Sequence, residues 1–283
     1  MTLIADSGSS KTTWCLTDHS GVVKEFSTKG YNPCYPGSES LSDILKPHLN
    51  VDFDPNEVTK VAFYGAGVLD DKYSVIEQAI QPIFPHAKID AASDLMAAAR
   101  ALLGHDSGFA AILGTGSNSC LYDGTKITHQ VKPLGFILGD EGSGAYMGKY
   151  LIGAYLRNDM PDDVRKAFKE TCRLTDEELI TQVYSNPTPN RYCASFANFL
   201  TGEMAGHEYM ENVVRHSFNA FFHHIVSKYP DYGDYAFNCA GSIGWLFRRT
   251  LAEVAKEYGM MTKNIISSPM EGLVVYHQLT VDS

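Results

Sequence analysis

A short polar loop near the start of the chain has residue types that could bind a phosphate group. The loop, Gly-Ser-Ser-Lys-Thr at residues 8–12, follows an apolar run that ends at Asp6. Small side chains leave backbone N–H groups accessible to phosphate oxygens, and Lys11 adds a positive charge. Asp6 supplies the kind of oxygen ligand that a hydrated Mg²⁺ accepts. The loop is therefore either a phosphate-binding hairpin or an ordinary β-hairpin of small residues.

The same loop invites comparison with a P-loop, in which Gly-x-x-x-x-Gly-Lys-Ser/Thr leads into a helix. Ser10 stands where the second glycine of that pattern belongs. Residues 12–17 are β-branched and aromatic types that favour a strand instead of a helix. The sequence thus disfavours a P-loop and predicts two strands joined by a hairpin.

A second loop of this type lies further along the chain. Residues 109–113 are apolar and run into Gly-Thr-Gly-Ser-Asn at 114–118, followed by a second strand, a turn and a third strand. The same order of elements occurs in residues 3–23, which predicts an internal duplication, with chance similarity of two short segments as the alternative. Two related domains would each supply one hairpin, and the pair could hold the phosphates of a nucleotide.

Acidic residues at two further places could act on such a nucleotide. Asp94 lies in the first turn of an alanine-rich helix predicted at residues 95–103, where the helix dipole stabilises a carboxylate by about 0.3–1 kcal/mol. The simpler explanation is the common preference for acidic residues at helix N-termini. Asp140 and Glu141 lie between glycines in residues 138–144, a segment that on its own could be a solvated turn.

Strands and helices alternate around these loops, which is typical of α/β lobes. Apolar side chains recur every three or four residues from Met210 to Ile225 and predict one face of a long helix. Ser268, Pro269 and Glu271 have the types of an N-cap, a first helical position and a capping box. We expect lobes at residues 1–105 and 106–283, with a last helix, from about residue 268, that packs back on the first lobe.

Composition excludes several classes of protein. The 283 residues are 44% hydrophobic with a net charge of −10, which is ordinary for a globular chain and lacks the basic stripe of a nucleic-acid binder. The first residues lack a secretory signal, and no apolar run is long enough for a membrane span. The six cysteines are scattered without a Cys-x-x-Cys pair, as expected of reduced thiols. We therefore expect a cytoplasmic protein without a nucleic-acid or membrane partner, and a homodimer is left open.

Taken together, the motifs resemble N-acetylglucosamine kinases and the related BadF/BadG-type ATPases, in the superfamily of sugar kinases and actin-like ATPases. The resemblance rests on Asp-x-Gly-x-x-Lys-Thr at residues 6–12, Gly-Thr-Gly-Ser-Asn at 114–118, Leu-Gly-Asp-Glu-Gly-Ser at 138–143 and Ala-Gly-Ser-Ile-Gly at 240–244. It covers nearly the whole chain. It implies an α/β fold of two actin-like ATPase (ribonuclease H-like) lobes flanking a nucleotide and sugar cleft.

The resemblance also implies an ATP- and Mg²⁺-dependent kinase that phosphorylates an amino sugar, most simply N-acetylglucosamine at O6. Asp94 matches the catalytic base of the family, and Asp6 matches an indirect magnesium ligand. The implied phosphate contacts are Gly8, Ser9, Lys11, Thr12, Thr115 and Gly116. The implied adenosine contacts are Gly241 and Ser242, and the implied sugar contacts are Asn32, Asn118 and Asp140.

One departure from the family bears on the identity of the sugar. Animal members carry Gly-Trp-Gly beside the N-acetyl group, and the matching residues here are Pro133, Leu134 and Gly135. N-acetylmuramic acid and glucosamine are therefore alternative acceptors. Two further alternatives are a BadF-type ATPase activator, which would need cysteines around an iron–sulfur cluster, and a nucleotide switch without a sugar site.

Overall fold

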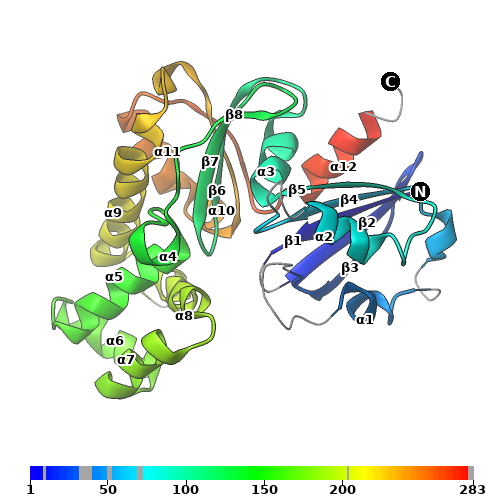
Figure 1. Cartoon of the computed structure of the whole chain (residues 1–283). Helices are drawn as coiled ribbons and strands as arrows, with labels where there is room; N and C mark the ends of the chain where they lie inside the picture. The colour runs from blue at the N-terminus through cyan, green and yellow to red at the C-terminus, as the bar shows by residue number, and fades with distance from the viewer. Residues whose placement is uncertain (9–10, 32–39, 50–52, 69–72, 203, 280–283) are drawn as a thin grey trace. The chain divides into compact units, whose positions relative to one another are not determined.

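The structure is a computed structural model that describes residues 1–8, 11–31, 40–49, 53–68, 73–202 and 204–279. The chain divides into two compact units. Unit 1 comprises Met1–Ser107, Asp123–Lys126 and Ser268–Ser283, and unit 2 comprises Gly108–Tyr122 and Ile127–Ser267. Each unit contains one five-stranded sheet (Figure 1).

The sheet of unit 1 has the strand order β3-β2-β1-β4-β5. Strands β1, β2 and β3 are antiparallel, whereas β1, β4 and β5 are parallel, so that the C-terminal ends of these last three strands lie at one edge. The register places Ser7 beside Gly65 and Gly65 beside Ser93 along that edge. The strands are β1 (Thr2–Ser7), β2 (Lys11–Asp18), β3 (Gly21–Lys29), β4 (Lys60–Gly65) and β5 (Lys88–Ser93).

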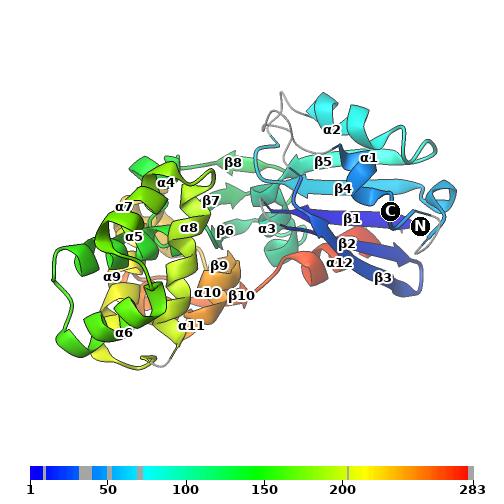
Figure 2. The ribbon, with the colours of Figure 1, turned by 90° about the horizontal axis from the view of Figure 1, so that it is seen from below.

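Helices cover both faces of this sheet (Figure 2). They are α1 (Leu41–Leu45), α2 (Tyr73–Ile80), α3 (Asp94–Leu103) and α12 (Met270–Leu279), with a short 3₁₀ turn η1 (Pro55–Glu57). Because side chains alternate along a strand, Leu3 and Phe63 pack towards α1 and α2, while Ile4 packs towards α3 and α12. The helix expected near residue 268 thus covers the same sheet face as α3. The Ser268 hydroxyl accepts a hydrogen bond from the Met270 N–H at 3.3 Å.

The sheet of unit 2 has the order β10-β9-β6-β7-β8. Read from the other side, this is the order of unit 1 with every strand number raised by five, and the antiparallel and parallel pairings correspond. The predicted internal duplication is therefore confirmed. The strands are β6 (Gly108–Leu113), β7 (Ser117–Tyr122), β8 (Ile127–His129), β9 (Phe237–Ala240) and β10 (Thr262–Ile266).

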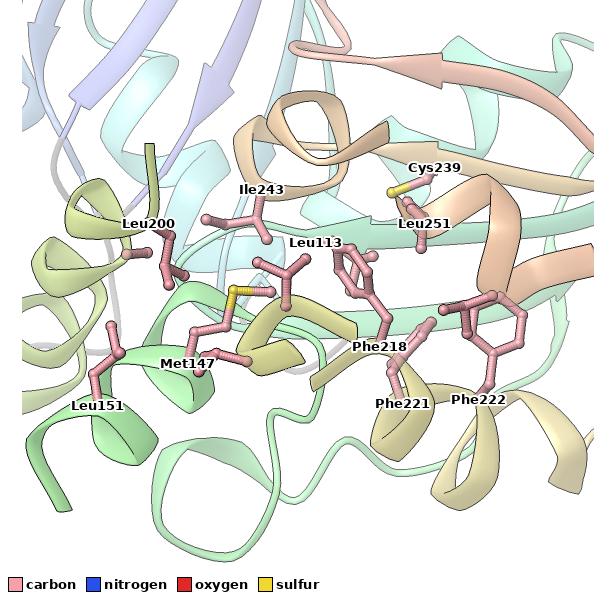
Figure 3. Packing of buried hydrophobic residues seen from close by; sticks show 14 of the residues in the cluster. Leu113, Met147, Leu151, Leu200, Phe218, Phe221, Phe222, Cys239, Ile243 and Leu251 are labelled. Carbon is pink, nitrogen blue, oxygen red and sulfur yellow. The ribbon is translucent and has the colours of Figure 1, made fainter. Parts of the chain in front are cut away.

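Unit 2 is richer in helices than unit 1. Its α-helices are α4 (Gly135–Leu138), α5 (Gly144–Leu156), α6 (Asp162–Cys172), α7 (Asp176–Ser185), α8 (Pro189–Ser195), α9 (Glu208–His224), α10 (Ser242–Leu246) and α11 (Arg248–Glu257). The described residues of unit 2 also form 3₁₀ helices, η3 (Phe196–Thr201) between α8 and α9, and η4 (Val226–Lys228) and η5 (Tyr232–Asp234) between α9 and β9. The predicted apolar face from Met210 to Ile225 lies on α9 and its C-cap residue Ile225, and it is buried. In Figure 3, Phe218 and Phe221 of this face pack near Leu113 of β6.

Among the described residues, no helix combines the length and the apolar character that crossing a membrane requires.

Candidate active site

Two carboxylates lie at the C-terminal edge of the unit 1 sheet. Asp6 is one residue from the end of β1, and Asp94 is the first residue of α3, directly after the end of β5. Burial, and then the nearby negative charge of Asp94, raise the pKa of Asp6 to about 6. The two residues are therefore close enough to interact, and the fold of unit 1 brings together two positions that are distant in the sequence.

The Asp94 carboxylate is held in a fixed direction by the start of α3. Ser93 caps the helix, with its hydroxyl accepting from the Met96 N–H at 3.2 Å, and Asp94 Oδ1 accepts from the Leu95 N–H at 2.8 Å. The sequence predicted that the helix N-terminus would favour the anion. Hydrogen bonds from backbone N–H groups at the helix start lower the pKa of Asp94, as this predicts, but burial is the larger effect and raises it.

Hydrogen bonds from buried hydroxyl groups stabilise the first hairpin, at residues 8–12. The Gly8 N–H donates to the Lys11 carbonyl at 3.0 Å, and Gly8 and Lys11 are exposed. Thr12 is fully buried, and its hydroxyl lies 2.7 Å from the hydroxyl of Ser7, which also donates to the Tyr31 carbonyl at 2.8 Å. The Thr12 side chain therefore supports the hairpin from inside. Sequence reasoning missed Ser7, whose only signal was a hydroxyl at the end of β1.

Two of the expected contacts, Ser9 and Asn32, lie outside the described residues.

The carboxylates of Asp6 and Asp94, at the C-terminal edge of the unit 1 sheet, are suitable ligands for a magnesium ion. Magnesium prefers oxygen ligands and usually keeps several waters, with one or two carboxylates and the phosphates of a substrate as its other partners. Within the described ranges, no group of three or more His, Cys, Asp or Glu side chains could form a complete metal cage. The paired carboxylates of Asp6 and Asp94 instead match a site that the substrate completes, and a cation would offset their mutual repulsion.

The second hairpin, in unit 2, is tied to the start of α5. The Gly114 N–H donates to the Gly116 carbonyl at 3.0 Å, which closes a three-residue loop between β6 and β7. The carbonyls of Gly114 and Thr115 accept from the N–H groups of Gly144 and Ala145, at 2.9 and 3.1 Å. The first N–H groups of α5, which lack partners inside the helix, are thereby satisfied. Thr115 remains exposed at the tip of the loop.

Asp140 lies directly against this hairpin. A Cβ at Gly116 would be 3.0 Å from Asp140 Oδ2, and the Asp140 carboxylate accepts a hydrogen bond from the Ser117 N–H. Asp140 is 8% exposed, and burial raises its pKa. The family resemblance implies that Gly116 contacts a phosphate, for which a small residue leaves the backbone accessible. The structure shows a second reason for a small residue here, because the Asp140 carboxylate occupies the space beside Gly116.

Asn118 follows on β7 and has its side-chain oxygen engaged. Oδ1 accepts from the Ser119 N–H at 2.9 Å and from Gln130 Nε2 at 2.8 Å. The NH₂ group is therefore the part of Asn118 that can donate to a ligand. Gln130 was not identified from the sequence, because no motif includes it.

The turn at Gly241 and Ser242 packs on the same edge of the unit 2 sheet. Gly241 has a φ of +125°, and a Cβ there would lie 2.4 Å from the Leu113 carbonyl oxygen, so only glycine fits. Ser242 is exposed and opens α10. Because Leu113 immediately precedes the second hairpin, unit 2 brings together Thr115, Gly116, Asp140, Gly241 and Ser242 at one edge. Asn118 lies on the adjoining strand β7.

The whole chain matches a solved structure from Porphyromonas gingivalis, that of a protein for which an N-acetylglucosamine kinase function has been suggested. The TM-score is 0.94 and the sequence identity is 37%, over 99% of this chain and 100% of the other. The chain belongs to the N-acetylglucosamine kinase family. No protein-family model matches the sequence, and the search of curated proteins gives no match.

More distant structures show how widely the fold of this family is shared. A Chromobacterium violaceum protein with the same suggested function matches with a TM-score of 0.70 and 15% identity, over 97% of this chain and 98% of that one. A ROK family glucokinase from Streptomyces griseus, solved with glucose and AMPPNP, matches with a TM-score of 0.57 and 14% identity, over 100% and 99%. The expected fold class, α/β with two actin-like ATPase lobes, is confirmed.

Proposed function

We propose that this protein is an ATP-dependent kinase that transfers the γ-phosphoryl group to an amino sugar, with O6 of N-acetylglucosamine as the acceptor atom. The observation that carries the proposal is the pairing of Asp6 and Asp94 at the sheet edge beside the first hairpin. Membership of the N-acetylglucosamine kinase family supports it. A kinase needs a group that takes the proton of the attacking hydroxyl and groups that hold the phosphates in line.

Asp94 is the proposed base. Its carboxylate is fixed by the Leu95 N–H, and a raised pKa favours acceptance of a proton at neutral pH. Gly8 and Lys11 of unit 1, with Thr115 and Gly116 of unit 2, would bind the phosphates. Gly241 and Ser242 would face the adenosine. Ser9 stays a proposed phosphate contact on the strength of the family motif alone.

Asp140 and Asn118 are the proposed acceptor ligands of unit 2. Asp140 presents a carboxylate that accepts from sugar hydroxyls, whereas Asn118 presents its NH₂ group as a donor. Asn32 is proposed as a further sugar contact from the family motif. Mg²⁺, held by Asp6 through water and by the phosphates, would neutralise charge on the triphosphate when bound.

The test is an ADP-release assay over N-acetylglucosamine, glucosamine, N-acetylmuramic acid and glucose, with ATP and Mg²⁺. We expect ADP release to depend on N-acetylglucosamine, and NMR of the product to show phosphate at O6. ADP release that no sugar stimulates would refute the proposal and favour an ATPase activator. A preference for N-acetylmuramic acid or glucosamine would keep the kinase and change the acceptor.

The proposed base is tested with Asp94→Asn, which keeps the size of the side chain but cannot take the proton. We expect kcat to fall by about 10²- to 10⁴-fold with little change in either KM. Asp43→Asn is the matched control, because Asp43 also lies in the first turn of a unit 1 helix. Retention of more than about a tenth of wild-type kcat in Asp94→Asn would exclude Asp94 as the base.

A further inference from the structure

Asp140 ends a closed loop in unit 2. Residues 133–140, here called the 133–140 loop, contain α4 and are closed by the Asp140 N–H, which donates to the Pro133 carbonyl at 3.1 Å. Gly139 lies against the same carbonyl, because a Cβ there would be 2.1 Å from its oxygen. The loop geometry and the position of Asp140 are therefore coupled: a shift of the loop moves the carboxylate.

Hydrophobic burial does little to hold this loop in place. Leu134, Ile137 and Leu138 are 59, 83 and 74% exposed, and Leu134 has a left-handed backbone with a φ of 61°. Phe136 alone among the four large apolar side chains of the loop packs against the core of unit 2. A segment with so little buried apolar area needs polar contacts to keep one conformation.

Lys149 of α5 provides such a contact. Its ammonium donates a hydrogen bond to the Phe136 carbonyl in the middle of the loop. The Nζ atom also lies 4.8 Å from the centre of the Phe136 ring and 5.9 Å from that of Tyr146, one turn earlier on α5. Cation–π contacts of this kind are stronger when the cation is partly desolvated, and Lys149 is half-buried.

The same ammonium acts on the charge at the end of the loop. The positive charge of Lys149 lowers the pKa of Asp140 and so opposes the effect of burial. In return, Asp140 and Glu141 raise the pKa of Lys149 against the lowering by burial. One side chain on a well-packed helix thus fixes the middle of the loop and stabilises the anion at its end.

We propose that Lys149 is a positioning residue of the acceptor site, holding the 133–140 loop and the Asp140 carboxylate in the arrangement that binds the sugar. This inference rests on the proposed function, since it takes Asp140 as an acceptor ligand. In this role Lys149 acts through Asp140 and the loop, because its contacts in the structure are with Phe136 and Tyr146. Its loss is therefore expected to change the affinity for the sugar and to leave the affinity for ATP nearly unchanged.

The first experiment compares Lys149→Met with wild type in the ADP-release assay, using N-acetylglucosamine as the acceptor. We expect the sugar KM to rise about 10- to 150-fold, as for a lost charge-assisted hydrogen bond, with the ATP KM within about twofold and a smaller change in kcat. Lys149→Arg keeps the charge and should restore much of the sugar affinity. Lys166→Met, at an exposed position on α6, is the control and should behave as wild type.

A double-mutant cycle with Asp140→Asn then separates positioning from general stabilisation. If Lys149 acts through Asp140, the Lys149→Met change should alter the sugar KM by less than about threefold once Asp140 is already Asn. Multiplicative effects, a rise in the ATP KM, or a fall in melting temperature without a change in sugar KM would each overturn the inference. A wild-type protein that shows no sugar-dependent ADP release would refute the proposed function and, with it, this role for Lys149.

Discussion

Helices α5 and α8 of unit 2 pack closely against each other at Gly148. A Cβ at this position would lie 1.8 Å from the carbonyl oxygen of Cys193 and 2.6 Å from its carbonyl carbon. Ordinary contacts of a Cβ are 3.4–4 Å, so the α8 backbone would have to move away by about 1.6 Å to admit a methyl group. The obstacle is main chain in a helix, which cannot rotate aside as a flexible side chain can.

The size of the effect of Gly148→Ala follows from two opposing contributions. Replacing glycine by alanine inside a helix favours the helix by about 1 kcal/mol. Overpacking a well-filled core costs about 1–3 kcal/mol and sometimes more, and a backbone displacement of this size belongs at the upper end. We expect a net loss of about 2 kcal/mol in the free energy of unfolding, which lowers the melting temperature by about 3–4 °C for a chain of 283 residues.

Gly153→Ala on the same helix is the matched control. A Cβ there would meet only the Nη1 atom of Arg157, at 3.1 Å, and the end of a long side chain can move aside. We therefore expect this variant to be about 0.5–1 kcal/mol more stable than wild type. Urea unfolding followed by circular dichroism measures both changes. If Gly148→Ala were as stable as wild type, or if both variants shifted in the same direction, the packing argument would be refuted.

Two other predictions concern the hairpin of unit 2 and the C-terminal helix. In Gly116→Ala the new Cβ would lie 3.0 Å from Asp140 Oδ2, so we expect the sugar KM to rise at least as much as the ATP KM. Steady-state kinetics with each substrate varied in turn measure both constants, and a rise in the ATP KM alone would contradict this expectation. Burial lowers the pKa of His277 from an ordinary 6.5 to about 4, so between these values the unfolded chain binds a proton that the folded chain does not. The free energy of unfolding should therefore decrease as the pH falls from about 6.5 to about 4, and urea unfolding of His277→Gln should show a weaker decrease; an unchanged pH dependence would argue against this.

The sheets could be predicted from the sequence because their signals are local. Apolar runs that end in small-residue hairpins marked β1 and β6, and comparison of the two segments predicted that β1, β2 and β3 correspond to β6, β7 and β8. The spacing of apolar residues from Met210 to Ile225 likewise predicted α9, because one helix face is buried along its length. The resemblance to the family then singled out Asp6, Asp94 and Asp140 as candidate site residues without any knowledge of their surroundings, and their roles stay predictions.

The surroundings themselves depend on contacts between distant segments, which no local pattern records. Helix α5 packs on the second hairpin. This packing determines both the contact of Gly116 with Asp140 and the hydrogen bond from Lys149 to the 133–140 loop. The effect of burial on the pKa of Asp94 was not predicted, for the same reason. The sequence indicates the helix N-terminus that lowers the pKa of Asp94. The burial that outweighs this effect depends on the packing of unit 1.

The placement of α12 has a consequence for the order in which the protein is made. The face of the unit 1 sheet that carries Ile4, Ala62 and Tyr64 is covered by α3 and by Leu273 and its neighbours on α12. The ribosome synthesises β1 before unit 2 and α12 only after all of unit 2. A nascent chain that ends anywhere within unit 2 therefore exposes a half-covered apolar sheet, and we expect such chains to engage chaperones until α12 docks.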